Sequence, residues 1–169
     1  FKRASLDDTI YVLTPQGRVI DLPRGATPID FAYRVHTDLG HHCRGAKVNG
    51  QLVSLNTPLE NGQTVEIMAT KEGGPSRDWL NPQQGYVATP RARQKIKQYF
   101  SALEEEEMLA RGRGVLIKEI QREGHGQANI DELAVRLGFK NAEALFIAAG
   151  RGEVGPRSIQ IALRGAESE

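Results

Sequence analysis

The sequence feature that most constrains the fold is a series of short strand-like runs in residues 7–70. Strong turn signals separate these runs. Thr-Pro-Gln-Gly at 14–17 lies between two β-rich runs and predicts a hairpin. Asn-Gly at 49–50 is the strongest short-range hairpin signal that a sequence can carry. A third turn, at 60–62, precedes the last run. The strands expected from this pattern are 10–13, 19–22, 46–48, 51–53 and 64–68.

One helix is marked between the two hairpins. Thr27 can cap its N-terminus, Pro28 suits the first helical position, and the Asp30 carboxylate lies where the helix dipole favours negative charge. The predicted helix, 28–37, is ended by Gly40. The resulting order, β-β-α-β-β-β, is that of a β-grasp (ubiquitin-like) fold for this first domain.

Residues 71–89 are predicted to be a packed joint. Gly-Gly-Pro at 73–75 and Asn-Pro at 81–82 interrupt any periodic pattern. The stretch nevertheless contains Trp79, the only tryptophan of the chain. A solvated linker rarely carries this side chain, so we expect the joint to pack on one or both domains. Stacking of Trp79 on a nucleic-acid base is the alternative.

The remainder, 90–165, is predicted to be a helical domain, which makes the whole chain α+β. Thr89 caps a helix that starts at Pro90, and apolar residues then recur at helical spacing. Gly112 and Gly114 each weaken this helix by about 1 kcal/mol relative to Ala, so we expect a break or kink there. Three short helices follow, at 130–137, 141–149 and 156–163.

Composition limits the possible functions. The net charge is +1, so a nucleic-acid interface has to come from local clusters of cations. Cys43 is the only cysteine, which excludes an intrachain disulfide and a cysteine zinc cluster and fits the cytoplasm. No apolar stretch approaches the roughly 18 residues that cross a membrane, so no membrane partner is expected. The chain starts at Phe1 without Met, as expected of a piece of a longer protein.

Cations at the start of the long helix are the clearest nucleic-acid signal. They are Arg91, Arg93, Lys95 and Lys97. The helix macrodipole disfavours positive charge there, and the four repel as i, i+4 pairs. Between 75 and 99 they and Arg77 face a single carboxylate, Asp78. Helix stability does not account for this arrangement, which favours contact with a polyanion. The alternative is a solvated face countered by Glu104–Glu107.

Histidines form a second candidate surface at the end of the first predicted helix. His36, His41 and His42 occur close together, beside Arg44. Histidine and arginine stack on and hydrogen-bond to unpaired nucleotides of single-stranded RNA. For His36 the alternative is a helix C-terminal residue that interacts with the negative end of the dipole. A metal site is not expected, because Asp38 is the only acidic partner at a suitable spacing.

Other motif-like segments carry no catalytic chemistry. The run Glu104–Glu107 spreads around a helix instead of converging on one point. Residues 130–149 imitate a helix-turn-helix, but the second helix is apolar and acidic, which argues against DNA binding. The glycine-rich segment 150–155 follows a helix and not a strand, so the context of a phosphate-binding loop is missing. We expect no catalytic residue, no metal site and no cofactor.

Motifs in the first domain and in the joint carry a family resemblance. They are Ile-Tyr-Val-Leu-Thr-Pro-Gln-Gly at 10–17, Thr-Pro-Ile-Asp-Phe-Ala-Tyr at 27–33, His-Thr-Asp-Leu-Gly-His at 36–41 and Pro-Ser-Arg-Asp-Trp-Leu-Asn-Pro at 75–82. The first three resemble the TGS domain shared by threonyl-tRNA synthetases, some GTPases and the RelA/SpoT enzymes. The fourth is similar to the segment after the TGS domain in RelA more than in SpoT. The sequence thus resembles the regulatory region of a RelA-type (p)ppGpp synthetase, a GTP pyrophosphokinase.

The resemblance implies a regulatory fragment that is not itself an enzyme, because the hydrolase and pyrophosphate-transfer domains of the parent enzymes have no counterpart in the sequence. It implies contact with the CCA end of deacylated tRNA, with ribosomal RNA, and intramolecularly with the synthetase domain. The residues expected to contact RNA are His36, His41, Arg44, Lys47, Arg77, Arg91, Arg93, Lys95 and Lys97. The alternative is a protein-interaction module that docks the synthetase domain or an acyl carrier protein.

Overall fold

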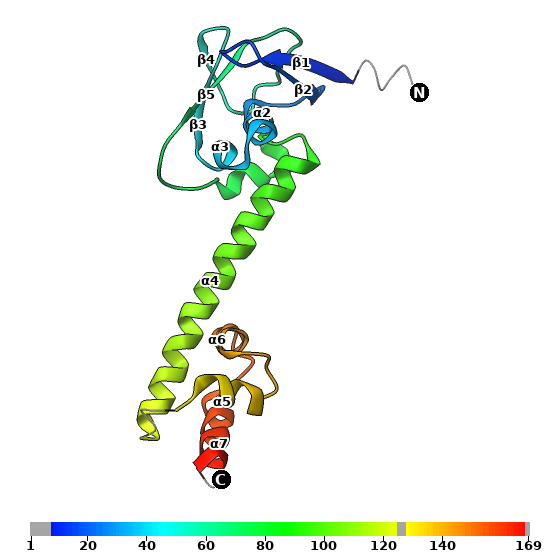
Figure 1. Ribbon diagram of the computed structural model, residues 1–169. Helices are drawn as coiled ribbons and strands as arrows, with labels where there is room; N and C mark the ends of the chain where they lie inside the picture. The colour runs from blue at the N-terminus through cyan, green and yellow to red at the C-terminus, as the bar shows by residue number, and fades with distance from the viewer. Residues whose placement is uncertain (1–7, 125–127, 168–169) are drawn as a thin grey trace. The chain divides into compact units, whose positions relative to one another are not determined.

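The computed structural model describes residues 8–124 and 128–167, which form two compact units. Unit 1 ends at Tyr99 and unit 2 begins at Phe100. Figure 1 shows the strands gathered with the helices α2 (Pro28–Val35) and α3 (Thr37–His41) in unit 1. The helix α4, Pro90–Arg122, contributes residues 90–99 to unit 1 and 100–122 to unit 2. All strands of the described residues lie in unit 1, and the α+β prediction is confirmed.

Unit 1 is built on antiparallel pairs of strands. Its strands are β1 (Thr9–Leu13), β2 (Val19–Pro23), β3 (Cys43–Val48), β4 (Gln51–Val53) and β5 (Val65–Ala69). β1 pairs with β2, and β3 lies between β4 and β5. A parallel bridge between Leu13 and Thr64 connects the two groups of strands. The predicted order of strands and helix in this domain is therefore confirmed.

Local turn chemistry sets both hairpins. Asn49 and Gly50 have φ values of 52° and 85°, the left-handed conformation that a two-residue hairpin turn requires at both positions. In the first hairpin the Thr14 hydroxyl accepts a hydrogen bond from the Arg18 amide at 3.0 Å. The Asn-Gly signal identified the tighter turn from sequence alone.

The helix predicted at 28–37 is wrong at its C-terminal end. It ends at Val35 as α2 (Pro28–Val35), and a second short helix, α3 (Thr37–His41), follows. His36 separates them because its backbone is extended and its side chain caps α3. Gly40 lies inside α3 and does not end a helix. A Cβ at Gly40 would collide with the ring of Tyr33, so packing explains the glycine.

The core of unit 1 lies between the strands and α2, which packs against β2, β3 and β5. Its buried side chains include Ile10, Val12, Leu22, Phe31 and Val65. They alternate with exposed residues along the strands, as expected of a sheet with one covered face. Unit 1 therefore has its own hydrophobic core.

The segment between β5 and α4 is compact. It contains two 3-10 helices, η1 (Arg77–Leu80) and η2 (Pro82–Gln84). Trp79 is only 6% exposed and Val87 only 7%. Burial of Trp79 within the structure leaves no ring face on which a base could stack.

Unit 2 is helical. It consists of the rest of α4 with α5 (Ile130–Arg136), α6 (Ala142–Gly150) and α7 (Pro156–Glu167). Its core includes Leu116, Leu145, Ile159 and Leu163. Asn129 and Asn141 cap α5 and α6 by accepting hydrogen bonds from the amides of Glu132 and Ala144. The three short helices predicted from sequence are confirmed.

Of the break or kink predicted at Gly112 and Gly114, the break is wrong, because α4 continues to Arg122. Gly112 lies against α6, where a Cβ would collide with the carbonyl oxygen of Phe146. A Cβ at Gly150 of α6 would likewise collide with the carbonyl oxygen of Met108. The missing side chains let the two backbones touch, and this packing compensates for the low helix propensity of glycine.

Within the described part of the chain, every helix is too short or too polar to cross a bilayer.

Candidate nucleic-acid interface

His36 is held at the junction of α2 and α3 with its ring exposed. Its backbone N–H donates to the Ala32 carbonyl at 3.0 Å. Its Nδ1 accepts a hydrogen bond from the Asp38 amide, also at 3.0 Å, and thereby caps α3. Because Nδ1 is an acceptor, the proton of the neutral ring is on Nε2. The side chain is 68% exposed, so His36 presents an N–H donor to solvent.

His41 faces inward instead. Its Nδ1 lies 2.8 Å from the Tyr33 hydroxyl, and the two rings meet edge to face at 5.3 Å. The Tyr99 ring of α4 lies 5.0 Å away on a tilted plane. Burial lowers the pKa of His41. The charge of Asp38 opposes this shift with a smaller effect, and His42 and Lys95 lower the pKa further. The neutral His41 ring is therefore part of the packing between α3 and the start of α4.

Tyr33 is the buried member of this cluster. It is 0% exposed, and burial raises the pKa of its phenol well above the usual value. Its hydroxyl keeps its proton at neutral pH and can donate it to His41 Nδ1. Sequence reasoning missed both Tyr33 and Tyr99. The sequence places Tyr33 on the first predicted helix, three residues after Asp30. Its partner His41 lies in another helix, α3, so the contact between them could not be predicted.

Among the remaining cations of the β-grasp domain and the joint, Arg44 is held by hydrogen bonds to the backbone. Its guanidinium donates to the carbonyls of Cys43 at 2.7 Å and Gly74 at 2.9 Å, which ties β3 to the start of the joint. Lys47 is half-buried on β3, and Arg77 is exposed at the start of η1. Arg44 is thus partly committed to a structural role.

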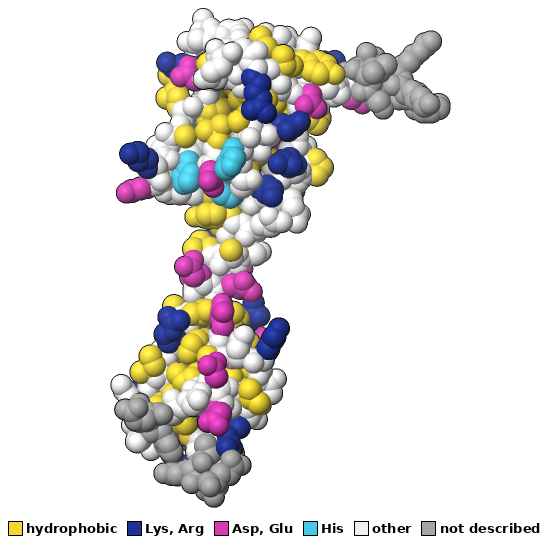
Figure 2. Space-filling model, in the orientation of Figure 1, with side chains coloured by type: hydrophobic (Ala, Val, Ile, Leu, Met, Phe, Trp, Pro, Cys, Tyr) yellow, Lys and Arg dark blue, Asp and Glu magenta, His cyan; other side chains and the backbone are white. Residues whose placement is uncertain are grey.

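The basic residues of α4 lie on the turns that belong to unit 1. Ala92 and Ile96 are fully buried on one side of the helix. Arg91 and Lys97 are exposed, and Arg93 and Lys95 are half-buried. Figure 2 shows Lys and Arg side chains near histidines on one face of unit 1. The structure therefore brings cations of α4 and histidines into the same unit.

A buried carboxylate fixes the start of α4. Asp30 is 1% exposed and accepts hydrogen bonds from the amides of Thr27, Ala88 and Thr89 at 2.9–3.0 Å, and from the Thr89 hydroxyl at 2.8 Å. The Thr89 hydroxyl in turn accepts from the amide of Ala92 at 3.2 Å and caps α4. Asp30 was predicted only as a favourable charge near its own helix terminus. Its second partner is 59 residues away, which no local pattern could reveal.

Of the residues expected to contact RNA, the structure gives His36 an exposed donor and places His41 and Arg44 largely in supporting contacts. Among the described residues, no group of three or more His, Cys, Asp or Glu side chains is arranged to hold a metal ion.

Comparisons with known proteins match both halves of the chain. The TGS domain family matches residues 10–69, and the RelA/SpoT AH domain family matches residues 99–164. A Synechocystis protein named probable guanosine-3′,5′-bis(diphosphate) 3′-pyrophosphohydrolase is 44% identical over 167 residues, which is 96% of this chain and 21% of the relative. The GTP pyrophosphokinase of Escherichia coli K12 is 42% identical over 149 residues, or 88% of this chain and 20% of the relative.

A third relative is the bifunctional (p)ppGpp synthase/hydrolase RelA of Mycobacterium tuberculosis, 43% identical over 159 residues, or 89% of this chain and 21% of the relative. The chain therefore spans about a fifth of the length of the curated relatives it matches. Relatives named for synthesis and for hydrolysis match at near-equal identity. With a TGS domain followed by a RelA/SpoT AH domain, the chain belongs to the RelA/SpoT family.

Proposed function

We propose that this chain is the part of a cytoplasmic RelA-type protein that recognises the CCA end of uncharged tRNA and neighbouring ribosomal RNA. In this proposal the binding state of the chain regulates a synthetase domain elsewhere in the same protein. That domain would transfer pyrophosphate from ATP to GTP or GDP, in keeping with the relatives named GTP pyrophosphokinase. The chain itself supplies binding and no catalytic residue.

The observation that carries the proposal is the exposed, oriented ring of His36. The α3 cap occupies Nδ1, so the ring cannot rotate freely and its Nε2–H points to solvent. A donor in this position suits acceptor atoms of an unpaired nucleotide, and the ring face is available for stacking. The cations of α4 add sequence-independent attraction to the phosphate backbone.

The test separates ligand contact from capping. His36→Ala removes the cap and the donor, whereas His36→Asn can keep the cap, because asparagine is a favoured N-cap residue, and still loses the Nε2–H donor and the ring. We expect both variants to weaken binding of deacylated tRNA by roughly tenfold or more, in line with about 1–3 kcal/mol for one stacked base. Thermal stability of His36→Asn should stay close to that of the parent chain.

Two controls complete the test. On tRNA that lacks its terminal CCA, neither substitution should weaken binding further. Aminoacylated tRNA should bind less tightly than deacylated tRNA to the unsubstituted chain. If His36→Asn bound deacylated tRNA as tightly as the parent chain, the role assigned to His36 would be wrong.

A further inference from the structure

One edge of β5 is left without a neighbouring strand. Among the described residues, the bridge from Leu13 to Thr64 is the last pairing between β1 and the β5 side of the sheet. The chain after Leu13 then turns back at 14–17 towards β2, whereas β5 continues to Ala69, paired with β3 alone. Alternate backbone N–H and C=O groups of β5 therefore point to a side on which no described strand lies.

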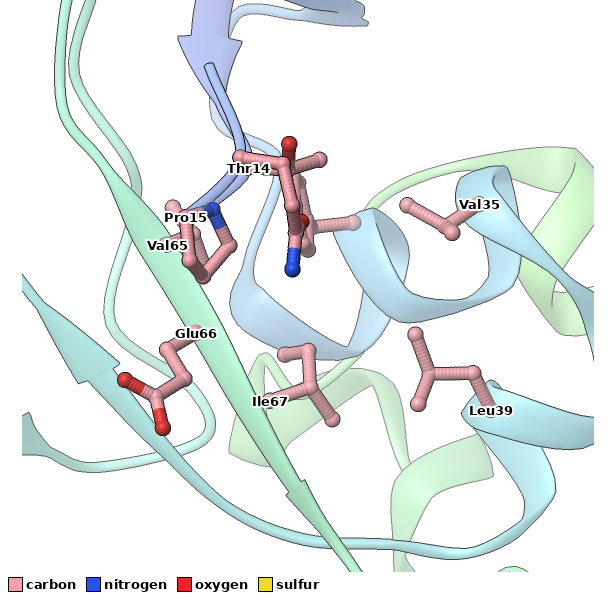
Figure 3. A pocket seen from close by; sticks show the side chains of 9 residues that line it. Thr14, Pro15, Val35, Leu39, Val65, Glu66 and Ile67 are labelled. Atoms are coloured by element: carbon pink, nitrogen blue, oxygen red, sulfur yellow. The ribbon is translucent and has the colours of Figure 1, made fainter. Parts of the chain in front are cut away.

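This edge borders a groove of about 370 Å³ that is lined mainly by apolar side chains, with Thr14, Gln16 and Glu66 as its polar members. Figure 3 shows β5 with Ile67 along one side, Pro15 near its start, and Val35 and Leu39 of the two helices on the far side. Val35, Leu39 and Ile67 are only half-buried, so their side chains remain partly accessible. The groove combines apolar walls with a row of backbone hydrogen-bonding groups.

The alternation of β5 gives the groove a charge preference. Val65 is buried and Ile67 half-buried on the side that faces α2, while Glu66 and Met68 are exposed on the opposite side. In Figure 3 the Glu66 carboxylate points away from Val35 and Leu39. Its cross-strand neighbour Lys47 is on β3, away from the open edge. A strand added beside β5 would place alternate side chains in the groove and the others next to Glu66, where cations are favoured.

We propose that this groove docks an extended segment of a protein partner, which adds to β5 as an extra strand. Backbone hydrogen bonds to β5 supply affinity, and side-chain pockets select the sequence, as in other cases of strand addition. The preferred segment alternates apolar residues, directed toward Leu39 and Ile67, with Lys or Arg beside Glu66. None of the residues expected to contact RNA lines this groove.

The test uses the ¹⁵N-labelled 169-residue chain and a capped heptapeptide, Lys-Val-Lys-Ile-Lys-Val-Lys. We expect its amide shift changes to concentrate on β5, Leu39 and the 14–17 turn. A peptide of the same sequence with alternate backbone nitrogens methylated should bind at least tenfold more weakly, because it cannot donate to the strand edge. Equal binding of the two peptides, no binding at millimolar peptide, or shift changes elsewhere would overturn the proposal.

Substitutions in the chain test the apolar wall at Leu39 and the charge of Glu66 separately. Leu39→Lys should weaken binding at least tenfold, whereas Leu52→Lys on β4, where the side chain is 68% exposed, should leave it unchanged. Glu66→Lys should weaken binding of the Lys-containing peptide several-fold. The same substitution should strengthen binding of a peptide in which Glu replaces every Lys. Because Glu66 is exposed, this exchange does not disturb the core. Failure of the charge exchange, or equal effects of Leu39→Lys and Leu52→Lys, would contradict strand addition at this site.

Discussion

At the scale of single residues, Asp30 joins the start of α2 to the start of α4 through a buried carboxylate. This carboxylate accepts hydrogen bonds from the amide of Thr27, at the start of its own helix, and from the amide of Thr89, 59 residues away. Asp30→Ala leaves the amides of Thr27, Ala88 and Thr89 without this partner. The hydrogen bonds from Thr27 and Thr89 are buried, and the one from Ala88 is part-buried. Each unsatisfied buried donor costs about 1–3 kcal/mol, so we expect a loss of about 2 kcal/mol or more in the free energy of unfolding.

Urea unfolding followed by Trp79 fluorescence measures this loss, since the only tryptophan lies in unit 1. Asp21→Ala is the matched control, because Asp21 is exposed and paired with the exposed Arg34 at 2.9 Å. An exposed pair contributes about 0–1 kcal/mol. Equal destabilisation by the two substitutions would show that the buried carboxylate has no special role.

His41 predicts how the stability of unit 1 depends on pH. Burial lowers its pKa in the folded state, whereas the unfolded chain takes up the proton near an ordinary pKa of about 6.5. Below that pH the unfolded state binds more protons, so the free energy of unfolding falls as pH falls. Urea titrations at pH 7 and pH 5 should show this loss, and His41→Gln should reduce it. The same pH dependence in both proteins would assign it to other groups.

The candidate site was only partly predictable at this scale. The cluster of histidines was evident in the sequence, but its division into an exposed His36 and an inward His41 depends on Tyr33 and Tyr99. Tyr99 lies 58 residues after His41 in the chain, in another helix. Sequence patterns indicate which residues are neighbours along the chain. They do not reveal contacts between side chains of distant helices.

At the scale of elements, Gly112 and Gly114 form a natural pair for experiment. Both lie in α4, where Ala is favoured over Gly by about 1 kcal/mol in an exposed helix. A Cβ at Gly114 meets open space, whereas one at Gly112 would collide with the backbone of α6. We expect Gly114→Ala to stabilise unit 2 by up to about 1 kcal/mol and Gly112→Ala to destabilise it.

Thermal unfolding followed by circular dichroism distinguishes the two substitutions, because their intrinsic helix propensities are identical. A similar rise in melting temperature for both would mean that α4 and α6 do not touch at Gly112.

The elements that sequence predicted well are those with local signals. Thr27, Asn129 and Asn141 each cap the helix that follows them, and Asn49-Gly50 forms the expected turn. The errors have non-local causes. Glycine in α4 was expected to break the helix because its propensity cost is local, but the compensating contact comes from α6. The end of α2 was placed too late because the side chain of His36 starts a new helix.

At the scale of the whole molecule, the family matches and the compact units divide the chain differently. The TGS match ends at residue 69 and the AH match begins at 99, so the segment between them belongs to neither. That segment nevertheless lies in unit 1, where Trp79 is buried and Thr89 binds Asp30. The first turns of α4, with their cations, thus fold as part of the same unit as His36.

This arrangement predicts that RNA binding depends on where positive charge lies and not only on how much there is. The first variant replaces the α4 cations by Gln, at Arg91, Arg93, Lys95 and Lys97. The matched variant removes the same charge from exposed positions of unit 2, at Arg111, Lys118, Lys140 and Arg157. Affinity for deacylated tRNA is measured at several salt concentrations, because the slope of affinity against salt reports how many phosphates the protein neutralises.

We expect the first variant to bind more weakly regardless of RNA sequence, with a slope flatter by up to about 0.7 for each single-strand phosphate that is no longer neutralised. The second variant should change the slope little, because its cations lie outside the proposed surface. Folding of the first variant should be unimpaired or slightly improved, since repulsion with the dipole and between i, i+4 neighbours is removed. Equal flattening in both variants would mean that net charge alone attracts the RNA, and the basic turns of α4 would then have no special part in binding.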